Sequence, residues 1–320
     1  MKDISPIFII GSPRSGTTLL RLILNRHSRI AIPEETWYFP DLYKRLEKFF
    51  KQKDWRFEVA GYIKKCTTVH FPELDESEIF SGLVDINKNE VPNILATINR
   101  LFAIKDNKPR WGDKTPGYVL HLPLLKNIFP EAKVVHIIRD GRDVVPSILK
   151  YWEVGPQTYS FIETAYYWKN HVKTGQKFGP RLFGKNYMEL RYEDLVSNPI
   201  EHTKIICEFI DEEFEPGMLE TKGESSSQVP DWEWHKKTKE KISNDRVGKW
   251  KNNMDSYELT VMHCIGRKIF LKKKYEIARD FNFRAILHVI LYNIDLCQVK
   301  LKHFIYTILK KIVLYERRFF

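Results

Sequence analysis

The apolar positions of the chain fall into runs that alternate between strand and helix patterns. Residues 4–10 form an apolar strand that leads into a glycine-containing turn, and residues 19–24 are apolar at helical spacing. The same order of strand, polar turn and helix returns at residues 132–138 and 144–149, and at 186–191 and 199–210. This alternation predicts an α/β fold with a doubly wound parallel sheet flanked by helices, in which ligands bind at the carboxyl ends of the strands.

Three segments differ from this alternation. Residues 41–110 lack a clean period and are rich in aromatic side chains, and we predict a helical insertion that covers the ligand site. Residues 223–244 are polar, and we predict a loop that closes over a ligand. Residues 266–320 carry apolar positions at mostly helical intervals among lysines, which predicts a basic amphipathic helical tail. The predicted main domain is therefore 1–265.

Composition and charge narrow the choice of partners. With 320 residues and 43% hydrophobic content, the chain can bury the core of one α/β domain. The net charge of +11 suits an anionic ligand, a nucleic acid or a membrane surface. Residues 266–320 contain 13 Lys and Arg and 4 Asp and Glu, so the tail carries +9 of this charge. The tail packs on the body or lies on an anionic membrane, and we favour packing.

The cysteines and the first residues of the chain help to predict the cellular compartment of the protein. Cys66, Cys207, Cys264 and Cys297 lie far apart and form no pair typical of a zinc site or a disulfide framework, which predicts buried free thiols. The first strand begins about four residues after Met1, which leaves no room for a signal peptide. We therefore expect a cytoplasmic protein, with peripheral membrane contact through the tail as the alternative.

The turn after the first strand, Gly11-Ser-Pro-Arg-Ser-Gly16-Thr-Thr, keeps the glycine spacing of a P-loop but has Thr17 at the lysine position. Backbone N–H groups of such a turn and of the following helix bind phosphate oxygens. Arg14 supplies a cation inside the turn, and the hydroxyls of Ser15, Thr17 and Thr18 can donate to oxygens that are less charged than a γ-phosphate. The turn therefore suits a phosphosulfate. The alternative is a connector that binds nothing.

Four further motifs carry chemistry. They are Pro33-Glu-Glu-Thr36, Trp111-Gly-Asp-Lys114-Thr-Pro116, Arg139-Asp-Gly-Arg-Asp143 followed by Ser147, and Arg246-Val-Gly-Lys249-Trp250. An arginine fork and a hydroxyl in the first turn of a helix suit phosphate oxygens. A carboxylate can take the proton of a hydroxyl, and a lysine can stabilise charge on a leaving group. The alternatives are a surface salt-bridge cluster, a solvated acidic turn, a turn lysine and a lysine-tryptophan pair over the core.

In order and spacing, these motifs resemble the sulfotransferases that use 3′-phosphoadenosine-5′-phosphosulfate (PAPS), most of all the branch related to tyrosylprotein sulfotransferases. The resemblance covers roughly residues 5–255. It implies an enzyme that transfers a sulfuryl group from PAPS to a hydroxyl acceptor by in-line displacement, with 1–265 as its catalytic domain. A saccharide, a lipid-linked glycan, a small alcohol and a tyrosine all remain open as acceptors. Neither a nucleic acid nor a metal is expected as a partner.

The resemblance also implies roles for single residues. Glu35 would be the general base, with Glu34 the weaker candidate, and Lys114 would assist the leaving adenosine 3′,5′-bisphosphate (PAP). The residues implied in PAPS binding are Arg14, Ser15, Gly16, Thr17 and Thr18 for the 5′-phosphosulfate, Arg139 and Ser147 for the 3′-phosphate, and Lys249 near the nucleotide. Arg14 would also act in catalysis. Lys114 would then replace the lysine that the glycine turn lacks.

Two rival functions remain. The first is a P-loop kinase that uses a magnesium nucleoside triphosphate, with Asp140 as the candidate carboxylate on the metal side. Thr17 at the lysine position weighs against it. The second is a nucleotide-binding or membrane-associated protein without catalysis. Glu35 and Lys114 together weigh against that function, because a binding protein needs neither a base nor a leaving-group cation.

Overall fold

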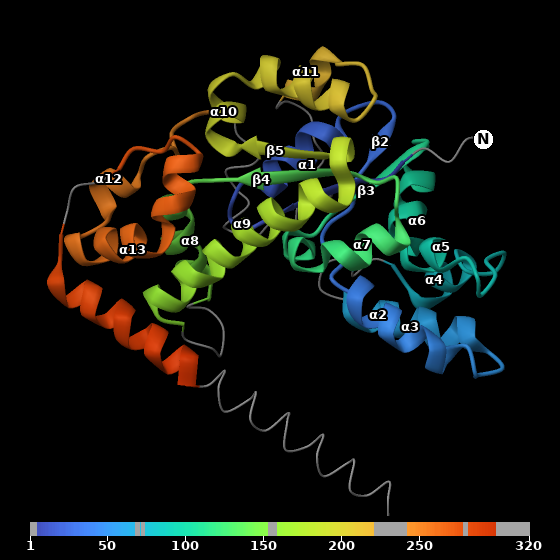
Figure 1. Ribbon diagram of the computed structural model, residues 1–320. Coiled ribbons are helices and arrows are strands. Elements are labelled where there is room, and N and C mark those ends of the chain that lie inside the picture. Colours follow the sequence, from blue (N-terminus) through green and yellow to red (C-terminus); the bar gives the residue numbers. More distant parts are fainter. Residues whose placement is uncertain are drawn as a thin grey trace, which may run out of the picture.

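A five-stranded parallel sheet forms the centre of the computed structural model, which describes residues 5–67, 71, 74–152, 159–220, 242–277 and 281–298. The strands run in the order β2-β3-β1-β4-β5 (Figure 1). Their bounds are β1 (Ile7–Gly11), β2 (Ile30–Ala31), β3 (Arg110–Lys114), β4 (Lys133–Ile138) and β5 (Tyr187–Arg191). Every pairing is parallel. The predicted α/β class and parallel sheet are therefore confirmed.

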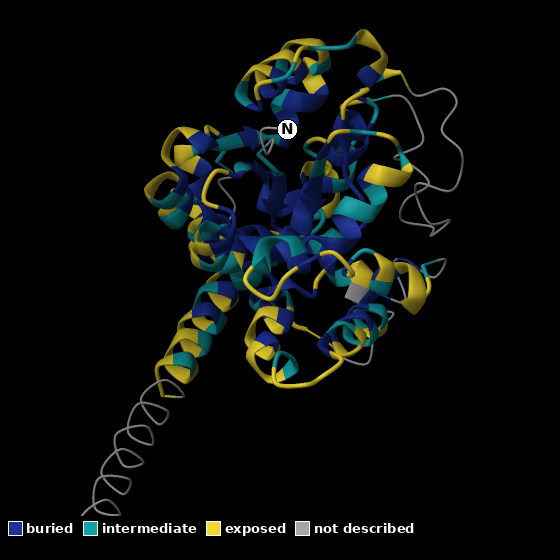
Figure 2. Ribbon diagram, turned by 90° about the vertical axis from the view of Figure 1, so that its right-hand side faces the viewer, coloured by how far each residue is buried: buried dark blue, intermediate teal, exposed yellow. Residues whose placement is uncertain are grey.

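Helices cover both faces of the sheet, because successive residues of the central strand point to opposite sides. Phe8 and Ile10 pack with α2 (Phe39–Phe49), α3 (Trp55–Thr67) and α7 (Leu122–Ile128). Ile7 and Ile9 pack with α1 (Thr17–Asn25), α10 (Tyr192–Ser197) and α11 (Pro199–Phe209). The inner strands β1 and β4 are almost fully buried (Figure 2), which is the usual setting of a parallel sheet, whereas the edge strand β5 is mostly half-buried.

A third core lies at the end of β4. It joins Ile138 to α8 (Gly141–Trp152), α9 (Phe161–Phe183), α13 (Ser256–Lys272) and a helix over residues 283–298. The last helix packs through Ala285 and Val289, so the packing that we favour for the tail is seen on one of its faces. The division that we predict at residue 265 falls inside α13. The short helix α12 (Trp250–Asn253) precedes α13.

The segment predicted as a helical insertion is helical. Besides α3 and most of α2 it contains α4 (Glu76–Ser81), α5 (Val91–Leu95) and α6 (Thr97–Lys105), and its last residue, Arg110, begins β3. The 3₁₀ helices are η1 (Pro116–His121), η2 (Gly184–Asn186) and η3 (Pro216–Leu219). The predicted loop at 223–244 lies outside the described residues except for 242–244.

The cysteines are all free, but only Cys207 is buried. The prediction of buried thiols is wrong for Cys264 and Cys297, which lie on the outward faces of α13 and of the helix over 283–298.

Among the helices that can be described, none has the length and apolar character needed to cross a membrane.

Candidate active site

The turn between β1 and α1 depends on two glycines. Gly16 has a φ of 95°, in the left-handed region, and a Cβ there would lie 2.3 Å from Cδ2 of Tyr192. A Cβ on Gly11 would lie 2.5 Å from the carbonyl oxygen of Ile137 on the neighbouring strand. Both distances are far below van der Waals contact, so a larger side chain would displace the turn. The glycine turn, residues 11–16, therefore keeps its shape only with these two residues.

The amino terminus of α1 offers donors for an anion. The helix begins directly after Gly16, and within the described residues no side chain caps it, so its first N–H groups can bind an anion. Ser15 is buried, and its Oγ has no hydrogen-bond partner among the residues that the structure describes. An unpaired buried hydroxyl costs about 1–3 kcal/mol. These donors fit the oxygens of a phosphate or sulfate group.

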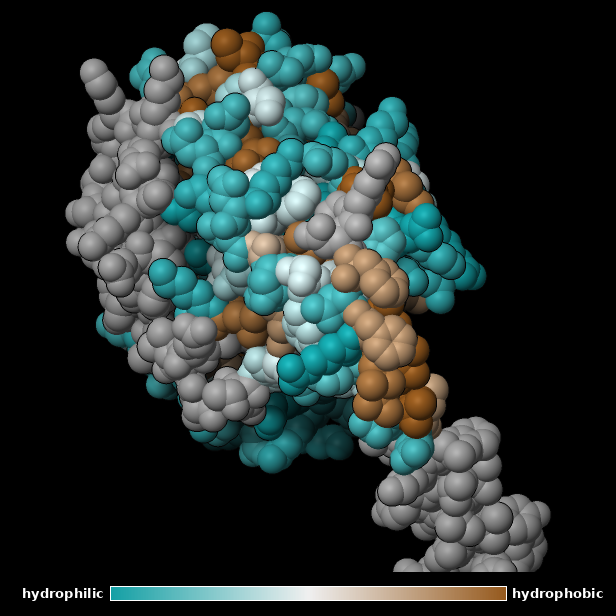
Figure 3. Space-filling view, turned by 90° about the vertical axis from the view of Figure 1, so that its left-hand side faces the viewer, coloured by the Kyte–Doolittle hydropathy of each residue, from teal (hydrophilic) through white to brown (hydrophobic). Residues whose placement is uncertain are grey.

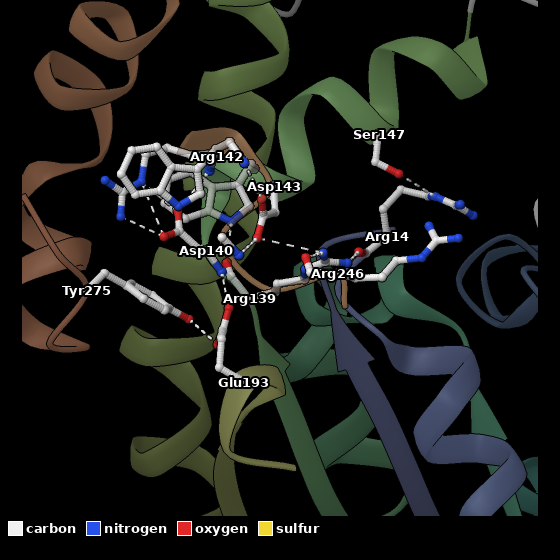
Figure 4. A network of polar contacts seen from close by, with 12 residues as sticks. Arg14, Arg139, Asp140, Arg142, Asp143, Ser147, Glu193, Arg246 and Tyr275 are labelled. Carbon is white, nitrogen blue, oxygen red and sulfur yellow. Dashed lines mark hydrogen bonds and ion pairs between the residues drawn. The ribbon is translucent and has the colours of Figure 1, made fainter. Parts of the chain in front are cut away.

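The two residues predicted to hold the 3′-phosphate lie next to this turn (Figure 4). Arg139 follows β4, and its Nη2 donates to the carbonyl oxygen of Arg246 at 2.6 Å, while Nη1 donates to that of Arg14 at 3.4 Å. Ser147 on α8 accepts a hydrogen bond from Nε of Arg14 at 3.1 Å. In the described part of the chain, the buried Nε of Arg139 has no hydrogen-bond partner. Arg14, Arg139 and Ser147 thus meet in one place.

A third arginine joins this group. Burial lowers the pKa of Arg14, and the guanidinium groups of Arg246 and Arg139 lower it further. Three cations that repel one another at a largely buried site are typical of a place that binds a multiply charged anion. Sequence analysis chose Lys249 from this segment, but Lys249 is exposed. Arg246 stands in the same motif, three residues earlier.

One carboxylate fastens the segment with Arg246 to α8. Oδ2 of Asp143 accepts a hydrogen bond from the backbone N–H of Gly248 at 2.9 Å, and Oδ1 accepts one from that of Trp250 at 3.0 Å. Burial raises the pKa of Asp143. Asp143 therefore fixes a segment about a hundred residues away along the chain, and it sets where Arg246 lies.

The predicted base and the predicted leaving-group cation contact each other directly. Lys114 ends β3 and is buried, and its Nζ donates to Oε1 of Glu35 at 2.8 Å and to Oε2 of Glu34 at 3.3 Å. Glu34 is buried, whereas the Glu35 side chain keeps 21% of its surface exposed. Only Glu35 of the two is therefore open to an acceptor. The geometry favours Glu35 over Glu34 as the general base.

Hydrogen bonds of the next residue, Thr36, anchor the backbone at Glu35. The N–H of Thr36 donates to Oγ1 of Thr115 at 3.1 Å, and Oγ1 of Thr36 donates to Oδ2 of Asp113 at 2.7 Å. Asp113 is fully buried, which raises its pKa to about 6. Burial, and to a smaller extent the charge of Glu35, raises the pKa of Tyr167 on α9 to about 12.

Asp140, the candidate metal ligand of the kinase alternative, is engaged elsewhere. Both of its oxygens accept hydrogen bonds from Arg142 at 2.6–3.2 Å. Its backbone N–H donates to Glu193, which also accepts a hydrogen bond from the hydroxyl of Tyr275. The guanidinium group of Arg142 also lies over the rings of Trp250, at 3.7 Å, and Phe270, at 4.7 Å. Asp140 therefore holds the turn after β4 together, which disfavours a role in binding magnesium.

Comparison with known proteins decides the family. The model described as "Sulfotransferase family" matches residues 6–216. The chain belongs to the sulfotransferase family. Protein-tyrosine sulfotransferase A of Caenorhabditis elegans is 30% identical over 64% of this chain and 49% of the relative. Protein-tyrosine sulfotransferase of Drosophila melanogaster is 28% identical over 68% of this chain and 40% of its own length. The chain thus spans half or less of these relatives.

Solved sulfotransferase structures share the fold. The sulfotransferase domain from the Synechococcus PCC 7002 olefin synthase has a TM-score of 0.61 at 19% identity and covers 87% of this chain and 98% of that domain. The sulfotransferase domain from the curacin biosynthetic pathway has a TM-score of 0.59 at 22% identity, over 86% of this chain and 99% of that domain. Together with the family match, they confirm the predicted resemblance and the P-loop-like fold.

In this sulfotransferase the parts of the site follow the order of the strands. Lys114 ends β3, the glycine turn follows β1 and Arg139 follows β4, and β1 lies between the other two strands. The carboxyl ends of parallel strands meet at one edge of a sheet. Glu35 and Lys114 therefore lie on one side of the glycine turn, and Arg139 lies on the other.

Proposed function

We propose that the protein transfers a sulfuryl group from PAPS to the hydroxyl group of an acceptor. The observation that carries this proposal is the order of three sites along one edge of the sheet. They are the pair of Glu35 and Lys114, the glycine turn, and the arginine group, by which we mean Arg139, Arg246 and Ser147. A donor with one anion at its reactive end and a second anion far from it matches this order. PAPS has a phosphosulfate and a separate 3′-phosphate.

The residues present fit such a donor. The amino terminus of α1, Ser15, Thr17 and Thr18 would hold the 5′-phosphosulfate with Arg14. Arg139, Ser147 and Arg246 would hold the 3′-phosphate, which would satisfy the buried Nε of Arg139 and offset the repulsion among the three arginines. Bound PAPS would supply an activated sulfuryl group.

The chemistry assigned to this chain is a proton transfer and a charge stabilisation. Glu35 takes the proton of the acceptor hydroxyl, so that its oxygen can attack the sulfur, and the 5′-phosphate oxygen leaves with PAP. The ammonium group of Lys114 stabilises the charge that grows on this leaving oxygen. The acceptor approaches from the side where Glu35 is exposed.

Calorimetry with PAP, adenosine 5′-monophosphate and ATP tests the proposal. We expect PAP to bind in the presence of EDTA at least about tenfold more tightly than the monophosphate, because each charge-assisted hydrogen bond to the 3′-phosphate contributes about 1.5–3 kcal/mol. The monophosphate lacks only that phosphate, so it is the matched control. Preference for magnesium ATP over PAP would establish the kinase alternative. Transfer of labelled sulfate from PAPS into fractionated cell extract then identifies an acceptor for kinetic assays.

We also propose that the protein contacts the surface of an anionic membrane through the helix over 283–298. Its inner face packs on the body, but Phe283, Leu287, Ile290 and Ile294 are 44–72% exposed. Their spacing of four, three and four residues places them on one face, which Figure 3 shows as a hydrophobic strip.

The sequence supports a membrane as the partner of this strip. The same spacing continues at Leu301, Ile305, Ile308 and Ile312, outside the described residues, among Lys300, Lys302, Lys310 and Lys311. Apolar residues on one face with flanking lysines match a bilayer that contains acidic lipids, and each basic residue near such a surface adds about 1 kcal/mol.

Flotation of the full chain with vesicles checks this contact. We expect binding to phosphatidylcholine vesicles that contain phosphatidylglycerol, and the double variant Phe283→Ser/Ile290→Ser should reduce the bound fraction at least about tenfold, because two apolar side chains lose their burial in lipid. Ile104→Ser is the matched control, since Ile104 is 72% exposed on α6. Equal flotation of the double variant and the wild type, or no flotation of either, would rule out the contact.

A further inference from the structure

Four charged side chains form a continuous row from α1 to the active site. Nη2 of Arg21 donates to Oε1 of Glu34, whose Oε2 accepts from Nζ of Lys114 at 3.3 Å, and the same Nζ donates to Glu35 at 2.8 Å. Arg21 and Lys114 are each about 1% exposed. The row therefore lies in the protein interior up to Glu35, where it reaches the surface.

Glu34 is the only member that contacts cations on both sides among the contacts that the structure describes. Its carboxylate is fixed by Arg21, which also donates to the carbonyl oxygen of Ile32 at 3.3 Å. Buried charges in such a row hold one another in place, because each unpaired charge would be costly in the interior. The position of Lys114 Nζ is thus set from behind by a carboxylate that cannot move away from Arg21.

This arrangement solves a problem posed by the proposed reaction. While Glu35 acts as a base it receives a proton and loses its negative charge, so it can no longer compensate the ammonium group beside it. Glu34 still can. An ammonium group has three N–H donors, and contacts to Glu34 and Glu35 use two of them. The third can then serve the leaving oxygen.

We infer that Glu34, held by Arg21, is a positioning residue that aims Lys114 at the leaving oxygen while Glu35 takes up the proton. This inference rests on the proposed function. It differs from a structural role for Glu34, because it predicts an effect on turnover that passes through Lys114 alone.

The first test compares Glu34→Gln with a matched control. Glu212 also bridges two cations from a largely buried position, with Arg110 at 3.1 Å and Arg29 at 3.0 Å, but Arg110 begins β3 whereas Lys114 ends it. We expect Glu34→Gln to lower kcat between about 10- and 100-fold, the range for a displaced catalytic group, with KM for PAPS nearly unchanged. Glu212→Gln should lower thermal stability and leave kcat unchanged.

The second test is a double-mutant cycle. If Glu34 acts through Lys114, then Glu34→Gln made in the Lys114→Ala variant should lower kcat by less than about twofold further. If it only supports the fold, the two effects multiply. Glu34→Asp serves if Glu34→Gln does not fold, because it keeps the charge but draws the carboxylate back by one methylene from Arg21 and Lys114; it should show the same loss of kcat.

The outcomes separate this inference from the proposed function. A wild-type chain that neither binds PAP nor transfers sulfate from PAPS contradicts both. A wild-type chain that transfers sulfate, with full turnover in Glu34→Gln or in Glu34→Asp, contradicts only the positioning role. Multiplying effects in the double-mutant cycle contradict it as well.

Discussion

Replacing Glu35 by alanine should lower turnover by about a hundredfold or more, the usual effect of removing a general base. The affinity for PAP should stay within about twofold, because Glu35 lies on the acceptor side of the glycine turn and Lys114 keeps Glu34 as its partner. The measurement is a steady-state assay with PAPS and an acceptor, together with a calorimetric titration of PAP.

Glu35→Gln is the closest control for this change. The amide keeps the size of the side chain and can still accept a hydrogen bond from Lys114, but it cannot take up a proton under these conditions. The two variants should therefore lose turnover to a similar extent. Full turnover in Glu35→Gln would show that Glu35 orients Lys114 and is not the base. Full turnover in Glu35→Ala would remove Glu35 from the mechanism.

The parts of the site that lie on local patterns were predictable from the sequence. The glycine turn is one, since Gly11 and Gly16 occupy backbone positions that exclude side chains, and an apolar strand and an apolar helix adjoin it. The strand before Arg139 is another, because it is buried on both faces and is apolar except for Lys133 at its start and His136. At these positions the local sequence pattern and the packing in the folded protein favour the same residue types, so the pattern alone was sufficient for the prediction.

The strand that carries Lys114 was not predicted, and its composition explains why. β3 reads Arg-Trp-Gly-Asp-Lys, without apolar alternation, yet it lies next to the central strand. Its polar side chains are buried because each has a distant partner: Arg110 pairs with Glu212, and Asp113 accepts from Thr36. Such partners lie far apart in sequence, so a local pattern of polar residues indicates a turn.

The last basic motif shows the same limit. The role of Lys249 stays a prediction, but Lys249 is exposed, whereas the charge of Arg246 lowers the pKa of Arg14. Asp143 fixes the backbone of this motif by accepting hydrogen bonds from the N–H groups of Gly248 and Trp250. Because Asp143 lies far from the motif in the sequence, this contact could not be predicted from the spacing of residues within the motif.

Replacing Arg139 by alanine should weaken binding of PAP more than any other single change in the arginine group. Its planar fork contacts two backbone carbonyls, lies 3.8 Å from Asp143 and rests on the ring of Tyr192, so it is held in one orientation for a phosphate. Loss of such a fork costs about 1.5–3 kcal/mol, or roughly 10- to 150-fold in affinity. Calorimetry with PAP measures it.

Two companion variants make this result specific. Arg246→Ala should also weaken binding of PAP, whereas Lys249→Ala, which removes an exposed cation from the same segment, should leave it unchanged. All three variants should bind adenosine 5′-monophosphate like the wild type, because that ligand lacks the 3′-phosphate. An equal loss of affinity for both ligands in Arg139→Ala would place Arg139 at the 5′-phosphosulfate instead. A larger loss in Lys249→Ala than in Arg246→Ala would return the nucleotide contact to Lys249.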